Sequence, residues 1–142
     1  MSAIERETRE FESRSSRSKG IFEKARELTP FGVHSNYRYI DPYPLYFSRA
    51  KGSKIWDADG NEYIDFNMGF GALVTGHSHP ILVREIGNCI DKGVLYGFEA
   101  EDSVELGRIV TSRFGYNMVR FSTTGAEATM HAVRLARAHT GR

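Results

Sequence analysis

The residues whose types and spacing most clearly suit a chemical role lie near the end of the chain. There an apolar segment, residues 118–122, is followed by Thr123, Thr124 and Gly125. A helical pattern follows over residues 125–139. The first N–H groups of a helix have no intrahelical acceptor, and the helix dipole adds partial positive charge at that end. Two hydroxyls and a glycine beside those groups suit a phosphate dianion. Taken alone, however, the same turn is more often only an N-cap.

Other reactive residue types give weaker signals. His34, His77 and His79 raise the alternative of a metal site, but histidines at positions i and i+2 of a helix start do not share a face, and no third ligand has suitable spacing. We therefore predict no metal site and expect His77 to cap or pack. Cys89 lies in an apolar stripe, so we expect a small core residue rather than a nucleophile. The motifs of serine hydrolases and of Walker-type nucleotide-binding proteins are absent from the sequence.

The first 28 residues are rich in charge, and their sparse apolar residues have a helical spacing. The apolar positions are Phe11, Ile21, Phe22, Ala25 and Leu28. This pattern predicts one mostly solvated helix that packs through a narrow stripe on another part of the protein.

Residues 44–66 follow a different pattern, because the apolar period drops to two. Alternating segments at 46–49, 54–57 and 62–66 are separated by the turn sequences Lys51-Gly52 and Asp59-Gly60. Such spacing predicts a three-stranded antiparallel meander. The glycine-rich stretch that follows, residues 69–76, permits close approach of backbones.

Three helices are predicted in the second half of the chain. The first spans about residues 78–91 and should bury an apolar stripe. Asp102 and Glu105 resemble a capping box, which would open the second helix. The third covers residues 125–139, and the apolar segment before it should be a short buried strand. Helices alternating with a strand in this order begin an α/β domain, and the partner strands of that single strand must lie outside these residues.

Composition excludes several classes of protein. The chain has 142 residues, 40% of them hydrophobic, and its 19 basic residues nearly balance 18 acidic ones. A balanced and scattered charge gives no support for a nucleic-acid or membrane surface, so we expect neither partner. Because the sequence contains no apolar run that resembles a signal peptide or a membrane span, we expect a cytoplasmic protein.

Five sequence blocks occur in an order that is specific to one family. They are residues 32–38, 49–52, 56–65, 76–80 and 119–128. In this order and composition the chain resembles the class III pyridoxal-phosphate aminotransferases, particularly glutamate-1-semialdehyde 2,1-aminomutase and its aminotransferase relatives. The resemblance runs from about residue 20 to the end, and it covers the N-terminal third of a typical member.

The resemblance assigns the Thr-Thr-Gly turn to the phosphate of the cofactor, pyridoxal 5'-phosphate. Thr124 and Gly125 match the family's phosphate-binding turn. Ala126 stands where the family has a threonine, so only its backbone N–H can bind. Losing one such hydrogen bond costs about 0.5–1.5 kcal/mol, and Thr123 could replace it.

The resemblance also implies a site for the substrate carboxylate. In the aminomutase branch a serine and an arginine before the meander hold this group, and Ser35 and Arg38 occupy those positions. A planar guanidinium binds a carboxylate through two parallel N–H bonds. Phe70 stands near the substrate where the aminomutase has tryptophan. Phe70 retains an apolar wall without the indole N–H, which favours a related aminotransferase over the aminomutase.

The resemblance implies a fold-type I α/β transferase that acts as a homodimer on a small amino acid or amino-carboxylate substrate. We expect residues 1–66 to form the N-terminal arm and meander of a small domain, and residues 67–142 to begin the large cofactor-binding domain. The lysine that binds the cofactor covalently is expected downstream, since the sequence has no lysine beyond Lys92. We therefore predict no catalytic residue in this chain and no activity for it alone. A non-catalytic interaction module is the alternative.

Overall fold

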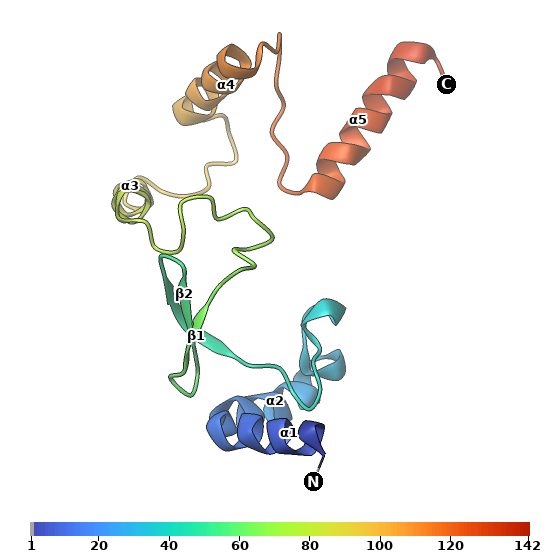
Figure 1. The fold of residues 1–142 in the computed structure, drawn as a ribbon. Helices are drawn as coiled ribbons and strands as arrows, with labels where there is room; N and C mark the ends of the chain where they lie inside the picture. Colours follow the sequence, from blue (N-terminus) through green and yellow to red (C-terminus); the bar gives the residue numbers. More distant parts are fainter. Residues whose placement is uncertain (1) are drawn as a thin grey trace. The chain divides into compact units, whose positions relative to one another are not determined.

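The computed structural model describes residues 2–142 and divides the chain into two compact units, Met1–Lys92 and Gly93–Arg142 (Figure 1). The first unit contains α1 (Ala3–Arg14), α2 (Ser16–Leu28), the 3-10 turns η1 (Pro30–Gly32) and η2 (Asn36–Arg38), β1 (Phe47–Lys51), β2 (Lys54–Asp57), β3 (Glu62–Ile64) and α3 (Pro80–Ile90). The second unit contains α4 (Glu101–Phe114) and α5 (Gly125–Thr140).

The predicted meander is confirmed. The strands lie in the order β1-β2-β3, and each pair is antiparallel. Ile55 on the central strand pairs with Ala50 on β1 and with Tyr63 on β3. Gly52 and Gly60 occupy the turns with φ of +58° and +93°, a backbone conformation that L side chains rarely adopt. The period of two in the sequence therefore produced the expected sheet.

The N-terminal segment forms two helices, so the prediction of one continuous helix is wrong. The chain breaks at Ser15, which has φ −133° and separates α1 from α2. Its hydroxyl donates to the Phe11 carbonyl at 2.5 Å and lies 3.0 Å from the Tyr43 hydroxyl. A serine hydroxyl that bonds locally to the backbone offers the chain an alternative to a continuous helix.

The small apolar core of this unit lies where α1 and α2 contact Tyr43. Phe22 and Tyr43 are buried, and the Tyr43 ring centroid is 5.1 Å from Phe11 and 6.4 Å from Phe22. Leu28, which was expected on the buried stripe, is instead 82% exposed, because α2 ends at that residue. The apolar stripe therefore packs through its middle residues alone.

The turn between β2 and β3 is organised by a buried carboxylate. Asp57 accepts hydrogen bonds from the N–H groups of Asp59 and Asn61, from the Asn61 amide and from the Tyr63 hydroxyl. These bonds satisfy a side chain that is 1% exposed. Since a buried charge without partners is costly, this network specifies the conformation of the turn.

The same turn joins the meander to the two N-terminal helices. Asp59 accepts from the N–H groups of Arg17 and Ser18 at 2.7 and 3.0 Å, and from the Ser18 hydroxyl at 2.9 Å. Asn61 donates from its amide to the Arg14 carbonyl at 2.8 Å. One turn thus binds the last carbonyl of α1 and the first N–H groups of α2, which have no partners within their own helices.

We expect Asp59→Ala to lower the free energy of unfolding by about 1–3 kcal/mol, since it removes a charged cap from α2. Urea unfolding would measure the change. Glu23→Ala, at an exposed position of the same helix, is the matched control and should change stability by less than about 0.5 kcal/mol. Equal effects of the two substitutions would contradict the capping role.

The three predicted helices of the second half are confirmed as α3, α4 and α5, with ends close to those expected. The predicted capping box of α4 is wrong. Ala100 is the N-cap and makes no side-chain cap bond, while Glu105 accepts from the Arg108 guanidinium at 2.6 and 2.7 Å. The Glu105 carboxylate therefore pairs with Arg108 on the helix surface instead of accepting from the backbone at the N-cap.

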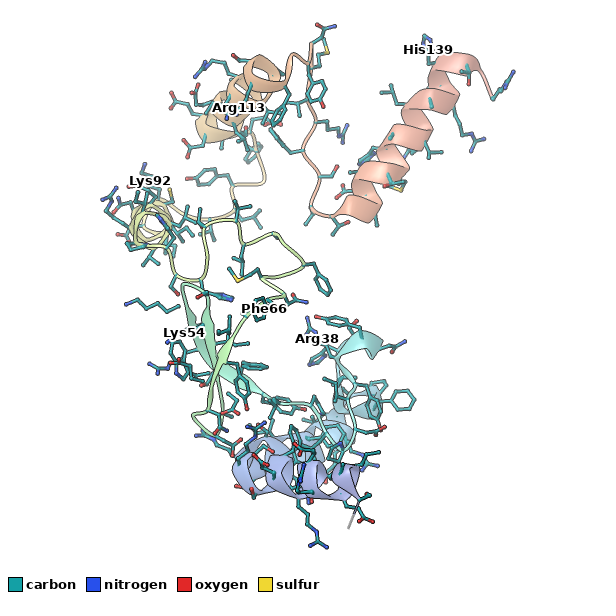
Figure 2. All side chains as sticks on the ribbon, viewed as in Figure 1. Arg38, Lys54, Phe66, Lys92, Arg113 and His139 are labelled. Atoms are coloured by element: carbon teal, nitrogen blue, oxygen red, sulfur yellow. The ribbon has the colours of Figure 1, made fainter. Side chains whose placement is uncertain are left out.

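Two predictions of burial are also wrong. The apolar side chains of α3 are exposed (Figure 2). The free thiol of Cys89 on the same helix is exposed as well. Residues 118–122 are extended but form no strand, because no other segment among residues 2–142 pairs with them. A strand needs hydrogen bonds to a neighbouring backbone, so apolar sequence alone does not create one.

Candidate functional site

The N-terminus of α5 presents a cluster of donors. Thr124 is the N-cap, with φ −139° and ψ 158°, and its hydroxyl oxygen accepts from the Glu127 N–H at 3.2 Å. The hydroxyl hydrogen therefore remains available for donation. The next two N–H groups, of Gly125 and Ala126, have no intrahelical acceptor and no other acceptor in the part of the chain that the structure describes. These three donors form the candidate phosphate cradle.

Glu127 occupies part of this helix end. Its carboxylate accepts from the Thr123 N–H at 2.9 Å and lies 3.3 Å from His131 Nε2. The Thr123 N–H, followed by the His131 side chain, holds the pKa of Glu127 below its ordinary value. Because Glu127 already uses the Thr123 backbone donor, the donors that remain for an anion come from Thr124, Gly125 and Ala126.

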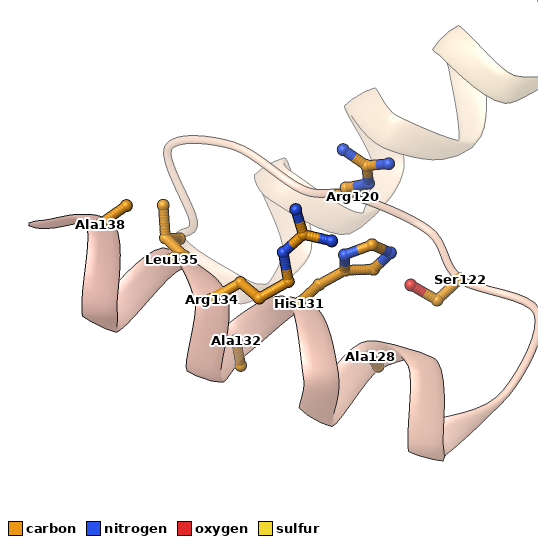
Figure 3. A pocket seen from close by; sticks show the side chains of 8 residues that line it. All are labelled: Arg120, Ser122, Ala128, His131, Ala132, Arg134, Leu135 and Ala138. Atoms are coloured by element: carbon orange, nitrogen blue, oxygen red, sulfur yellow. The ribbon is translucent and has the colours of Figure 1, made fainter. Parts of the chain in front are cut away.

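An open hollow lies on one side of α5 (Figure 3). It is lined by Arg120, Ser122, Ala128, His131, Ala132, Arg134, Leu135 and Ala138. The cradle residues do not line it. Because none of Thr124, Gly125 and Ala126 is among its lining residues, this hollow is distinct from the candidate anion site.

The candidate carboxylate residues lie in the first unit, on η2 and the turn before it. The carbonyl of Ser35 accepts from the Arg38 N–H at 2.9 Å, which brings the two residues to either end of one turn. Ser35 makes no side-chain cap bond, so its hydroxyl is available. Arg38 Nε donates to the Tyr37 hydroxyl at 3.1 Å, and the guanidinium carbon lies 5.5 Å from the Tyr37 ring centroid.

Phe70 belongs to the same cluster although it is far from Arg38 in sequence. Its ring packs against Tyr37 edge to face, with centroids 5.0 Å apart and planes at 67°. The structure therefore brings Ser35, Arg38 and Phe70 together through Tyr37, a residue that the sequence analysis did not select. Only the structure shows that Tyr37 joins the arginine to Phe70.

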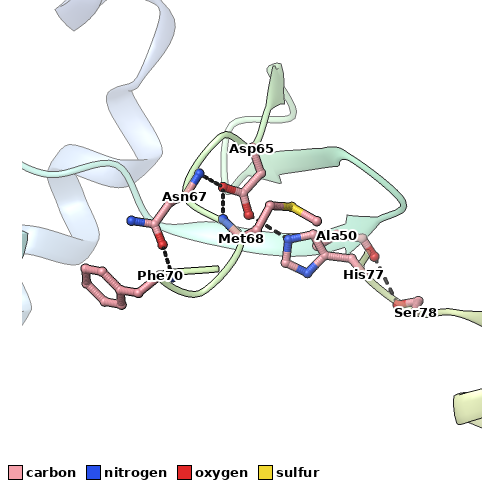
Figure 4. Close-up of polar contacts among 7 residues, drawn as sticks. All are labelled: Ala50, Asp65, Asn67, Met68, Phe70, His77 and Ser78. Atoms are coloured by element: carbon pink, nitrogen blue, oxygen red, sulfur yellow. Dashed lines mark hydrogen bonds and ion pairs between the residues drawn. The ribbon is translucent and has the colours of Figure 1, made fainter. Parts of the chain in front are cut away.

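The loop that carries Phe70 is held by polar contacts at its base (Figure 4). Asp65 accepts from the N–H groups of Asn67 and Met68 at 2.8 and 2.9 Å, and Asn67 accepts from the Phe70 N–H at 2.9 Å. Phe70 itself has φ +58°, in the left-handed region that is costly for a bulky residue. The surrounding hydrogen bonds stabilise this conformation and so determine where the ring lies.

His77 closes the loop from its other end. Its Nε2 lies 2.7 Å from Asp65, and its backbone forms a bridge with Gly52 in the β1–β2 turn. The His77 side chain, followed by the Met68 N–H, holds the pKa of Asp65 below its ordinary value. His77 thus hydrogen-bonds to Asp65, and His79 is the N-cap of α3.

The Asp65–His77 pair gives a prediction for pH dependence. A carboxyl whose pKa is lowered by folding stabilises the protein above its unfolded pKa, about 3.9 for aspartate, and loses this contribution as pH falls through the folded value. We therefore expect Asp65→Asn to destabilise the protein near pH 7 and to lose much of this effect near pH 3. Urea unfolding across this range would test it, and a difference independent of pH would contradict it.

Comparisons with known proteins place this chain in a family. The model of the family described as aminotransferase class-III matches residues 37–142. The chain belongs to the class-III aminotransferase family. Among curated proteins, it is 46% identical over 126 residues to glutamate-1-semialdehyde 2,1-aminomutase of Thermoplasma acidophilum, covering 88% of this chain and 30% of that protein.

Solved structures of class-III aminotransferases agree. An omega-transaminase from Sphaerobacter thermophilus is 36% identical with a TM-score of 0.84, over 88% of this chain and 29% of its own. A variant of a glutamate-1-semialdehyde-aminomutase from Pseudomonas aeruginosa PAO1, in complex with PMP, is 26% identical with a TM-score of 0.85. The match covers 97% of this chain and 31% of that protein. The predicted fold class, the N-terminal portion of a fold-type I transferase, is confirmed. The chain spans about 30% of the length of the curated relatives it matches.

The class-III family implies pyridoxal phosphate as cofactor, and the α5 N-terminus fits its phosphate. Backbone N–H groups, a hydroxyl donor and the positive end of a 16-residue helix form a donor set suited to an anion. A Cβ placed on Gly125 would meet no heavy atom within 4 Å, so the space beside its Cα is open. The cradle lies in the second unit and the carboxylate cluster in the first.

Two further findings concern the described residues. Among residues 2–142, no group of three or more histidine, cysteine, aspartate or glutamate side chains is arranged to hold a metal ion. Within the same range, none of the helices has the length and apolar character needed to cross a membrane.

Proposed function

We propose that this chain is the N-terminal part of an enzyme that transfers an amino group to or from a carboxylate-bearing substrate with pyridoxal phosphate. The observation that carries the proposal is the presence of two clusters of donors suited to anions in a chain whose residues 37–142 match the class-III family. One cluster surrounds the N-terminus of α5 and suits a phosphate. The other combines the Arg38 guanidinium with the Ser35 hydroxyl and suits a carboxylate.

Each cluster has a distinct role in the proposed reaction. Thr124, Gly125 and Ala126 bind the cofactor phosphate, with Thr123 supporting the turn through its bond to Glu127. When bound, pyridoxal phosphate supplies a ring that withdraws electrons from the carbon bearing the amino group. The protein residues of this chain contribute orientation and not the chemical step.

The substrate is held by the carboxylate cluster. Arg38 binds the carboxylate through two parallel N–H bonds, and Ser35 adds a hydroxyl donor. Phe70 forms an apolar wall that limits the entry of water beside the bound substrate. Fixing the carboxylate determines how far from it the reacting amino group lies, so this cluster selects the class of substrate.

The extent of the complete enzyme is part of the proposal. The curated relatives are more than three times as long as the matched segment, which supports a longer protein with its cofactor-binding lysine downstream. In that protein we propose that residues 1–66 belong to the small domain and residues 67–142 begin the large one. We also propose a cytoplasmic homodimer, as the family resemblance implies.

Reading the coding DNA beyond the codon for Arg142 is the first experiment. We expect the reading frame to continue into a lysine-bearing segment that follows further strands and helices. A stop codon directly after Arg142 would remove the enzyme proposal and favour a non-catalytic interaction module, which should remain colourless when mixed with pyridoxal phosphate.

A second candidate function is the intramolecular reaction of glutamate-1-semialdehyde 2,1-aminomutase. Curated relatives with that name are 42–48% identical to this chain, which favours it. Phe70, which replaces the tryptophan expected of that branch, favours the aminotransferase. Assays of the complete enzyme distinguish them: an aminotransferase needs separate amino donor and keto acceptor, whereas the aminomutase converts the semialdehyde alone.

A further inference from the structure

The Arg38 guanidinium has one edge already occupied. Its Nε donates to the Tyr37 hydroxyl at 3.1 Å, and its central carbon lies 5.5 Å from the centre of the Tyr37 ring. Among residues 2–142, no carboxylate lies within ion-pair distance of Arg38, and no residue accepts a hydrogen bond from its two terminal nitrogens. A guanidinium binds a carboxylate either through Nε and one terminal nitrogen or through both terminal nitrogens, and Tyr37 leaves the second fork free.

We propose that Tyr37 is a positioning residue that directs the terminal fork of Arg38 toward the substrate carboxylate. The proposal deepens the function above and rests on it, because it requires Arg38 to bind that carboxylate. Arginine has many rotamers, and a side chain that is oriented before binding loses less freedom when the ligand arrives. The Tyr37 hydroxyl accepts from the Nε edge of the guanidinium, so the edge with the two terminal nitrogens faces away from it. The Tyr37 ring also contacts the guanidinium through a cation–π interaction.

Tyr37 is in turn supported from a second segment of the chain. Phe70 packs edge to face on its ring at 5.0 Å, and the Asn67 side chain accepts from the Phe70 N–H at 2.9 Å. Tyr37 is itself 56% exposed, so this ring contact is a substantial part of what orients it. The chain of contacts runs from Asn67 through Phe70 and Tyr37 to Arg38, and it ends at the free fork.

The test is a double-mutant cycle in the complete enzyme. Tyr37→Phe removes the hydroxyl and keeps the ring that contacts Phe70 and Arg38. We expect KM for the carboxylate substrate to rise about five- to tenfold, with kcat changed less than about twofold, because one hydrogen bond to a charged group is lost. In an Arg38→Ala background, Tyr37→Phe should have no further effect on KM.

Tyr39→Phe is the matched control, since Tyr39 follows on the same turn and donates to Asp41 instead. It should leave KM unchanged. An unchanged KM for Tyr37→Phe, or the same increase with and without Arg38, would overturn the positioning role. If Arg38→Ala itself left KM unchanged, the proposed carboxylate site would fail, and this result is distinguishable from failure of the Tyr37 inference alone.

Discussion

Arg38→Ala in the complete enzyme is expected to raise KM for the carboxylate substrate about 100-fold, since it removes a bidentate, charge-assisted contact. About 2.8 kcal/mol of binding free energy corresponds to this factor. The spectrum of the bound cofactor should remain unchanged, because Arg38 lies outside the phosphate cradle. Steady-state kinetics and an absorbance spectrum of the same preparation measure the two quantities.

Arg38→Lys separates charge from geometry. Lysine keeps the positive charge but lacks the planar fork, so we expect KM to rise about tenfold, less than the rise for Arg38→Ala. Arg49→Ala is the control, because Arg49 also stacks on an aromatic ring, 4.0 Å from the centre of Trp56, and is not assigned to the site. Kinetics of Arg38→Ala equal to those of the wild type would remove Arg38 from the site.

Thr124→Ala is expected to weaken binding of pyridoxal phosphate about 30-fold. The substitution removes the hydroxyl that caps α5 through the Glu127 N–H and that we propose also donates to the phosphate. The cap contributes about 1 kcal/mol, and a hydrogen bond to a charged group contributes about 1.5–3 kcal/mol. Titration of the apoenzyme with the cofactor, followed by absorbance, would give the dissociation constant.

Two other substitutions test the chemistry of Thr124. Thr124→Ser keeps a hydroxyl at the N-cap and should bind the cofactor within about threefold of the wild type. Thr140→Ala removes a hydroxyl from the opposite end of α5, where it donates to the Ala136 carbonyl, and should leave cofactor affinity unchanged. Wild-type affinity in Thr124→Ala would show that the hydroxyl does not reach the phosphate.

Local patterns in the sequence predicted the elements that depend on neighbouring residues. Alternation over residues 44–66 predicted the meander, and Thr124 before a helical pattern predicted the cap of α5. The helix break at Ser15 and the surface pairing of Glu105 with Arg108 were missed. The helix propensity of serine does not exclude it from a helix interior. Only the contacts of the Ser15 hydroxyl with the Phe11 carbonyl and the Tyr43 hydroxyl show why the chain turns there.

Side-chain clusters were predicted less completely than elements. The sequence indicated Ser35, Arg38 and Phe70 by resemblance, whereas Tyr37, which joins the last two, became evident only in the structure. Burial was predicted poorly for α3, and Cys89 is exposed. A periodic apolar stripe indicates that a face can be buried, but its burial depends on which other segment reaches it.

The sequence by itself determined the family, the strand period and the approximate ends of α3, α4 and α5, because each depends on residue types within a few positions or on ordered motifs. Only the tertiary structure decided that Asp59 caps α2 from 41 residues away and that Phe70 supports Tyr37. It also decided which edge of Arg38 stays free. Such contacts depend on the distance and direction between distant segments, which arise when the chain folds and which no local pattern encodes.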